Sequence, residues 1–156
     1  MNYIKSDAPS ARHIVLVHGM GSAATAWKPL APLLKVAYNV ITVDLPGHGQ
    51  TPMDKSQPMD PRSLANLVVR EVERQFDVTE FDLVGNSWGG WIALEMAAAH
   101  PDVVKSVTAL APAGFWLATF VQRYPGTSAL RFLAKNSAPL APTFLKYEWS
   151  RKLGFE

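Results

Sequence analysis

Short apolar runs alternate with longer segments in which apolar residues recur every three or four positions. The runs cover residues 13–17, 38–43, 81–84 and 103–110. The first run is rich in β-branched side chains and apolar on both faces, which is typical of a strand buried in a parallel sheet. The segments between the runs have the apolar spacing of helices that cover such a sheet.

Three helices are expected between these runs. The clearest begins at Asp60, because an N-cap residue followed by Pro61 is a favoured helix start. A second is predicted over residues 27–34, weakened by two prolines, and a third over residues 91–99, ending before Pro101. The apolar face of the helix that begins at Asp60 is formed by Leu64, Leu67, Val68, Val72 and Phe76.

Strands that alternate with helices predict an α/β fold, a three-layer sandwich with a mostly parallel sheet. Residues 1–12 leave room for one short additional edge strand. Residues 103–110 form the last expected strand, whose outer edge would be free to pair with another chain. Residues 117–156 hold six Lys or Arg and two acids. This segment has weak helical periodicity and no buried-strand run, so we expect it to be helical. We therefore expect a partial core over residues 1–114 and the start of a helical cap over residues 115–156.

Composition narrows the classes of function. The chain has 156 residues, suited to one domain, and 48% of them are apolar against 18% charged. The formal net charge is +2 and no basic tract occurs, which argues against nucleic-acid binding. The absence of cysteine excludes disulfides and thiol nucleophiles, and it favours a cytoplasmic location. No apolar run is long enough to cross a bilayer.

The segment Gly85-Asn86-Ser87-Trp88-Gly89-Gly90 carries the clearest chemistry. It follows an expected strand and precedes an expected helix. A serine on a sharp strand-to-helix turn is held out from the sheet, where its hydroxyl can attack a substrate. Gly85 and Gly89 fit such a turn because it brings backbones close together. The other interpretation is an ordinary serine in a tight turn.

Two further motifs follow the first two strands: His18-Gly19-Met20-Gly21 and Asp44-Leu45-Pro46-Gly47-His48-Gly49. With the serine motif, their order and spacing resemble the α/β-hydrolase fold family over about residues 14–115. The resemblance implies that Ser87 is the nucleophile. It also implies that the backbone N–H groups of Met20 and Trp88 form the oxyanion hole, and that the C-terminal strands of the family are absent from this chain.

The family places its catalytic acid and histidine after the nucleophile. Here the distant acids after Ser87 are Asp102, Glu148 and Glu156, and His100 is the sole later histidine. His100 would lie at the far end of the intervening helix from Ser87, several turns away, whereas a general base must come within about 3 Å. We therefore expect a truncated chain that lacks the acid and histidine of the triad and is inactive by itself.

The remaining histidines precede Ser87. His18 and His48 are expected to brace loops beside it, and a role for either as a substituted base is the alternative. His13 begins a strand at the opposite edge of the sheet and is expected to be structural.

The expected reaction is hydrolysis of a small carboxylic ester through an acyl-enzyme. Phe115 and Trp116 could line an apolar substrate pocket, or pack the cap on the sheet. Asn86 resembles the subgroup that cleaves carbon–carbon bonds of ring-cleavage products, which is one alternative. The other is a non-catalytic fragment or binding scaffold.

Neither a metal nor an organic cofactor is expected. No cluster of His, Asp and Glu has metal-ligand spacing, and no glycine-rich phosphate loop occurs. The expected partners are a small ester-like molecule and, through the free sheet edge, another copy of the chain. Nucleic acid and a membrane span are not expected.

Overall fold

A computed structural model describes residues 2–5 and 12–114, all of which belong to one compact unit formed by residues 1–115. For residues 2–5, only the backbone is described. The predicted cap over residues 115–156, with Phe115 and Trp116, lies outside the described residues. The elements are β1 (Asn2–Lys5), β2 (His13–Val17), η1 (Ala24–Trp27), α1 (Ala31–Leu34), β3 (Asn39–Asp44), α2 (Pro61–Phe76), β4 (Phe81–Asn86), α3 (Trp88–Ala99) and β5 (Val104–Leu110).

The strands form one sheet in the order β1-β3-β2-β4-β5. Strands β3, β2, β4 and β5 are parallel, and β1 runs antiparallel to β3 along the edge. In the centre, Val15 of β2 is paired with Ile41 of β3 and with Leu83 of β4. The prediction of four parallel strands with one short extra edge strand is confirmed. All four parallel strands therefore end at the same edge, where the loops after them meet.

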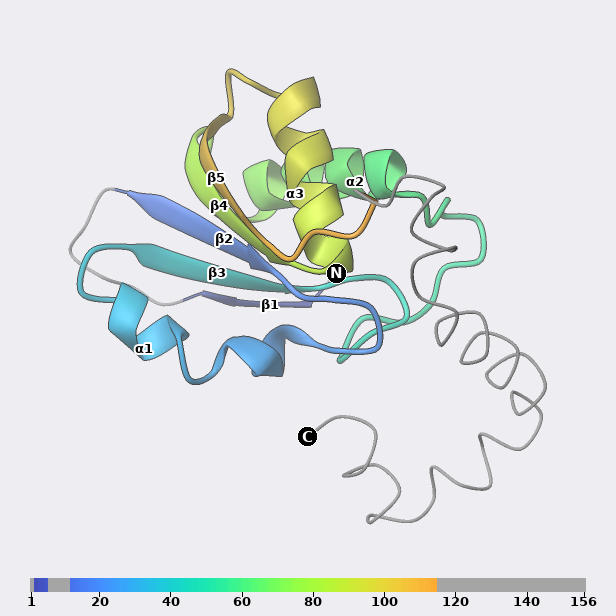
Figure 1. Cartoon of the computed structure of the whole chain (residues 1–156), viewed down its shortest axis with the longest axis horizontal. Coiled ribbons are helices and arrows are strands. Elements are labelled where there is room, and N and C mark those ends of the chain that lie inside the picture. Colours follow the sequence, from blue (N-terminus) through green and yellow to red (C-terminus); the bar gives the residue numbers. More distant parts are fainter. Residues whose placement is uncertain (1, 6–11, 115–156) are drawn as a thin grey trace, which may run out of the picture. The chain divides into compact units, whose positions relative to one another are not determined.

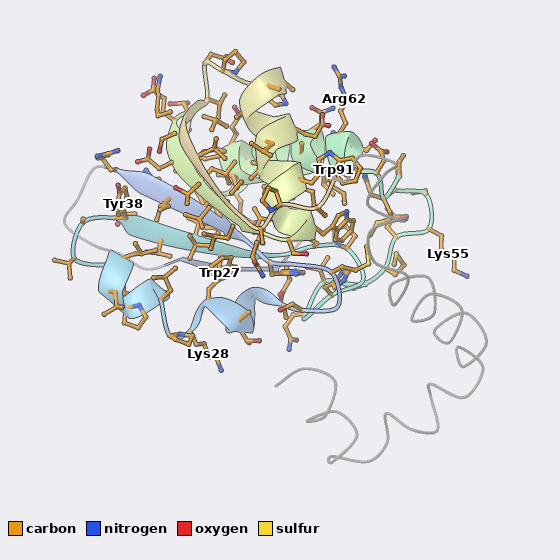
Figure 2. All side chains as sticks on the ribbon, in the orientation of Figure 1. Trp27, Lys28, Tyr38, Lys55, Arg62 and Trp91 are labelled. Atoms are coloured by element: carbon orange, nitrogen blue, oxygen red, sulfur yellow. The ribbon has the colours of Figure 1, made fainter. Side chains whose placement is uncertain are left out.

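Helices cover the sheet on both faces (Figure 1). Helices α2 and α3 lie on one face, and η1 and α1 lie on the other. The larger core lies beneath α2 and α3 and includes Val15, Ile41, Leu83, Val68 and Ile92, each at most 1% exposed. Trp27 extends from η1 toward the sheet and packs with Ile14, Leu16 and Val40, whereas Lys28 points outward (Figure 2). The expected three layers are thus present.

Helix α2 begins as its sequence predicts. The Asp60 carboxylate accepts a hydrogen bond from the backbone N–H of Ser63, 2.9 Å away, and Pro61 occupies the first turn. The helix ends at Phe76, and the capping residue Asp77 has a backbone conformation in the left-handed region, with φ 55°.

The helix expected over residues 27–34 is broken. A 3-10 turn covers Ala24–Trp27 and a single α-turn covers Ala31–Leu34. Pro29 and Pro32 explain the break, because proline lacks the N–H that continues a helix and clashes with the preceding turn. The predicted apolar stripe of Trp27, Leu30, Leu33 and Leu34 is kept only in part. Leu30 and Leu34 pack against Trp27 and its neighbours, whereas Leu33 is 71% exposed.

No helix within the described residues is long and apolar enough to cross a membrane.

Candidate functional site

Ser87 occupies the turn between β4 and α3 in a strained backbone conformation, with φ 53° and ψ −114°. A positive φ is uncommon for a residue that carries a side chain and persists only where the surrounding structure enforces it. A serine at this position of a helix ordinarily caps the first turn with its hydroxyl. Here the Ser87 side chain makes no capping hydrogen bond, and the residue is exposed. The hydroxyl is therefore available for other chemistry.

Two glycines allow the chain to take this turn. A Cβ on Gly85 would overlap the carbonyl oxygen of Gly89, and a Cβ on Gly89 would overlap the carbonyl oxygens of Val17 and His18. The N-terminal end of α3 therefore lies directly against the end of β2. The helix begins at Trp88, directly after the turn and three residues before the start of the helix expected over residues 91–99.

The turn is tied to the end of β5 by backbone hydrogen bonds. The N–H of Ser87 donates to the carbonyl oxygen of Leu110 over 2.9 Å, and the N–H of Ala113 donates to the carbonyl oxygen of Ser87, also over 2.9 Å. These bonds on both sides of the serine enforce its strained conformation.

The loop after β2 lies beside the serine. A Cβ built on Gly19 would be 3.3 Å from the Cβ of Ser87. Within residues 12–114, neither the backbone N–H of Met20 nor that of Trp88 donates a hydrogen bond to protein. Two amides without an acceptor among these residues thus lie near Ser87, one in this loop and one at the N-terminus of α3. At a helix N-terminus, unsatisfied N–H groups and the helix dipole favour an anion.

The side chains of these two residues differ. Trp88 is buried, at 8% exposure, and Met20 is 70% exposed. Met20 therefore presents an apolar surface to solvent from the loop after β2.

His18 is buried beneath this loop, and both ring nitrogens are occupied. Nε2 accepts a hydrogen bond from the backbone N–H of Leu45 at 3.1 Å, and Nδ1 lies 2.7 Å from the carbonyl oxygen of Gly19. Since the amide must donate and the carbonyl must accept, the ring is neutral and carries its proton on Nδ1. Burial lowers the pKa of His18, with the neighbouring His48 adding to the effect. No lone pair is left for Ser87.

His48 is committed in the same way. Its Nε2 accepts a hydrogen bond from the backbone N–H of Gly21 at 3.2 Å, and its Nδ1 donates to the carbonyl oxygen of Pro46 at 3.0 Å. The His48 ring lies between His18 and Trp88, with ring centroids 5.1 and 5.9 Å away. The structure therefore supports the expectation that both histidines brace loops, and their bonding leaves neither one free to act as the base.

The other two histidines lie away from the serine. His100 ends α3, at the opposite end from Ser87, and its Nε2 lies 2.8 Å from Oδ1 of Asn66. His13 begins β2, at the sheet edge opposite the serine. All four histidines of the chain are therefore described, and no hydrogen bond joins any of them to the Ser87 hydroxyl.

Two of the acids that follow Ser87 lie in the described part, and neither is bonded to a histidine there. Glu95, on α3, accepts a hydrogen bond from Nε1 of Trp91 at 3.2 Å. Asp102 is exposed just after α3, at the far end from the serine. Glu148 and Glu156 lie outside the described residues.

Asp44 organises the loops beside the serine, a role that sequence analysis missed. It is buried, at 3% exposure. Its carboxylate accepts hydrogen bonds from the backbone N–H groups of Ala24, at 2.7 Å, and Gln50, at 2.9 Å. One carboxylate thus joins the loop after β2 to the loop after β3. Its place in the Asp-Leu-Pro-Gly turn was the available signal, because a buried acid at a strand end needs donors.

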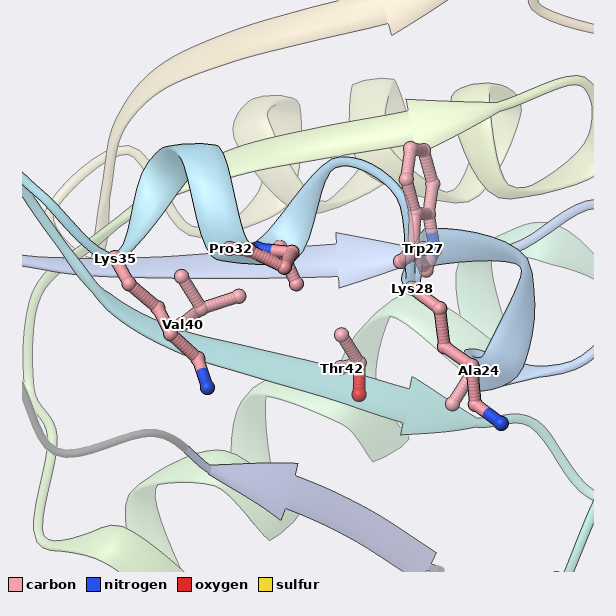
Figure 3. Close-up of a pocket in the computed structure, with 8 residues that line it drawn as sticks. Ala24, Trp27, Lys28, Pro32, Lys35, Val40 and Thr42 are labelled. Carbon is pink, nitrogen blue, oxygen red and sulfur yellow. The ribbon is translucent and has the colours of Figure 1, made fainter.

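A separate cavity of about 260 Å³ lies between α1 and β3 (Figure 3). Val40 and Thr42 contribute one side from β3, and Trp27 and Pro32 contribute the other. None of the residues that line it belongs to the Ser87 turn or to residues 18–22. The cavity is therefore distinct from the site built around the serine.

Among the described residues, no group of three or more His, Asp or Glu side chains is placed to hold a metal ion.

A family model, similar proteins and similar solved structures all indicate the same family. The family model described as alpha/beta hydrolase family matches residues 14–155. The chain is similar to the pimeloyl-[acyl-carrier protein] methyl ester esterase of Neisseria meningitidis serogroup C, with 33% identity over 143 residues, or 92% of this chain and 52% of the relative. It is also similar to the probable lysophospholipase BODYGUARD 1 of Arabidopsis thaliana, with 33% identity over 112 residues, or 69% of this chain and 24% of the relative.

Among solved structures, a putative lipase from Acinetobacter baumannii superposes with a TM-score of 0.70 and 28% identity, covering 80% of this chain and 42% of that one. The chain spans about half the length of the Neisseria esterase that it matches.

Proposed function

Because the chain belongs to the alpha/beta hydrolase family, we propose that Ser87 is the nucleophile of a serine hydrolase that cleaves a small carboxylic ester. The strained, uncapped and exposed serine at the start of α3 is the observation that carries the proposal. The Ser87 oxygen attacks the ester carbonyl, the alcohol leaves, and an acyl-enzyme forms that water then hydrolyses.

The oxyanion of this reaction would be held by the backbone N–H groups of Met20 and Trp88. Their lack of protein acceptors within the described residues supports the assignment. Preorganised donors of this kind contribute about 3 to 4 kcal/mol each to transition-state stabilisation.

An ester with an apolar acyl group suits this site best. The exposed Met20 side chain belongs to the loop that approaches the serine at Gly19, and it offers an apolar surface there. The names of similar proteins describe an esterase and a lysophospholipase, which favours ester cleavage over carbon–carbon cleavage. Phe115 and Trp116 remain predicted pocket residues. A cytoplasmic location is part of the same proposal, supported by the absence of cysteine.

We further propose that the general base comes from outside these 156 residues. All four histidines of the chain are described, and the two nearest the serine have both ring nitrogens bonded to backbone. Without a base the chain would acylate slowly and would not turn over. A purely binding role for the pocket is the competing possibility.

Fluorophosphonate labelling tests the nucleophile. We expect slow labelling of the wild-type chain, at most one label per chain, and none in Ser87→Ala. Ser56→Ala removes another exposed serine and serves as the matched control. Labelling that persists in Ser87→Ala would exclude Ser87 as the nucleophile.

Turnover of p-nitrophenyl esters tests the base. We expect no multiple-turnover hydrolysis by the chain alone. Sustained hydrolysis that disappears in Ser87→Ala would show that the chain contains its own base.

A further inference from the structure

The two histidines beside Ser87 contact the two peptide units on either side of the Met20 Cα. The unit before it contains the Gly19 carbonyl and the Met20 N–H. The unit after it contains the Met20 carbonyl and the Gly21 N–H. His18 bonds the first unit at the Gly19 oxygen, over 2.7 Å, and His48 bonds the second at the Gly21 nitrogen, over 3.2 Å.

The first contact determines where the Met20 N–H points. A trans peptide is planar, so its carbonyl oxygen and its N–H point in opposite directions. The Gly19 oxygen accepts from the ring of the buried His18 at 2.7 Å and also from the backbone N–H of Ser22 at 3.2 Å. The Met20 N–H therefore points away from His18, and it has no acceptor within the described residues.

The second contact prevents rotation about the Met20 Cα. Gly21 has φ 73°, a value at which the chain reverses sharply. The Gly21 N–H is held by a ring that is itself bonded to Pro46 and placed between His18 and Trp88. With both flanking peptide planes bonded, the Met20 amide has one orientation.

We propose that His18 and His48 are positioning residues of the oxyanion hole, which together aim the Met20 N–H at the oxygen that becomes negative when Ser87 attacks. The claim rests on the proposed function for its chemical consequence, but its geometry can be tested separately. Each ring acts through backbone and touches no reacting atom. Both rings must be neutral with the proton on Nδ1, because each Nε2 accepts from an amide.

The tautomers provide a test that does not depend on activity. Long-range 15N–1H correlation spectra of the folded chain near neutral pH should show both rings with a protonated Nδ1 and an unprotonated Nε2. A ring of the opposite tautomer, or a charged ring, would overturn the proposal whatever the reactivity of Ser87.

Substitutions test the effect on chemistry, measured as the maximal rate of Ser87 labelling by a fluorophosphonate and, separately, as the affinity for that probe. His18→Leu removes the side-chain donor to the Gly19 oxygen and leaves only the weaker bond from the Ser22 N–H, whereas the side-chain amide of His18→Asn can replace the lost donor. We expect the rate to fall about 100-fold in His18→Leu and to stay within about 10-fold of wild type in His18→Asn, with little change in affinity. Equal rates in the two variants would overturn the role of His18.

Because His18→Leu alters a buried site, His48→Phe gives a second measurement at a half-buried ring. It keeps the aromatic stacking and removes the bond to Gly21, so the labelling rate should fall about 10-fold and the Gly21 amide should lose protection from hydrogen exchange. His100→Asn, at the far end of α3, is the control and should label at the wild-type rate. An unprotected Gly21 amide in the wild type would contradict the role of His48. Absence of labelling in the wild type would contradict the proposed function instead, and the tautomers and amide protection would then decide the positioning claim.

Discussion

At the scale of single residues, the proposed site separates unpaired polar groups from bonded ones. The Ser87 hydroxyl and the Met20 and Trp88 amides lack protein partners within the described residues. The two neighbouring histidines, by contrast, have both ring nitrogens hydrogen-bonded to backbone. His18 is bonded to Gly19 and Leu45, and His48 is bonded to Gly21 and Pro46. Bonded groups keep the unpaired ones in place, which is what electrostatic preorganisation requires.

His18 also makes stability depend on pH. Burial lowers its pKa from 6.5 in the folded chain, so the unfolded chain binds a proton that the folded chain resists. This contribution to the free energy of unfolding is complete above about pH 6.5 and decreases as the pH falls toward the lowered pKa. Urea unfolding at pH 7.5 and 5.5 should show lower stability at pH 5.5.

The variant His18→Asn should show a smaller difference between the two pH values. The Glu71 carboxylate does not obscure the test, because its pKa is lowered by its hydrogen bond from Arg74, so its contribution is lost only below about pH 4.5. An unchanged pH dependence in His18→Asn would contradict the assignment.

At the scale of elements, the contact of α3 with β2 places the serine. The helix approaches the strand so closely that Gly89 has no room for a side chain. The same approach brings the loop after β2 next to the turn after β4. The burial of Ile92, Ala93 and Met96 on α3 keeps the helix on the sheet.

Gly89→Ala should therefore be costly, although alanine favours helices more than glycine does. The new methyl group would meet carbonyl oxygens of Val17 and His18, and backbone cannot move aside as a side chain can. We expect a loss of about 1–3 kcal/mol in the free energy of unfolding, measured with urea. Ala98→Ser, on the exposed face of α3, is the control and should change it by less than about 0.5 kcal/mol. A Gly89→Ala variant as stable as wild type would show that the helix and strand are farther apart.

At the scale of the whole molecule, β5 is the exposed end of the sheet. Within the described residues it pairs with β4 and with no other strand. Lys105, Ser106, Thr108 and Leu110 are all exposed along it. An open edge of this kind can pair with another chain.

Self-association should therefore rise with protein concentration in sedimentation velocity experiments. Thr108→Lys should reduce it, because a charged side chain on an edge strand disfavours edge-to-edge pairing. Thr25→Lys adds the same charge at an exposed position of η1 and should leave the association unchanged. A chain that stays monomeric at all concentrations would contradict the prediction.

The amino-acid sequence by itself determined the order of the elements and the place of the serine. Those features are local: an apolar run makes a buried strand, Asp60 and Pro61 begin a helix, and Gly85 and Gly89 permit the turn at Ser87. The tertiary structure decided what depends on distance between separate segments. Whether His18 and His48 could serve as bases was left open by the residues alone, because their hydrogen-bond partners come from Leu45 and Gly21, 27 positions away in each case. The bridging role of Asp44 was hidden for the same reason, since a carboxylate reveals its function only when the amides that surround it have been brought together by the fold.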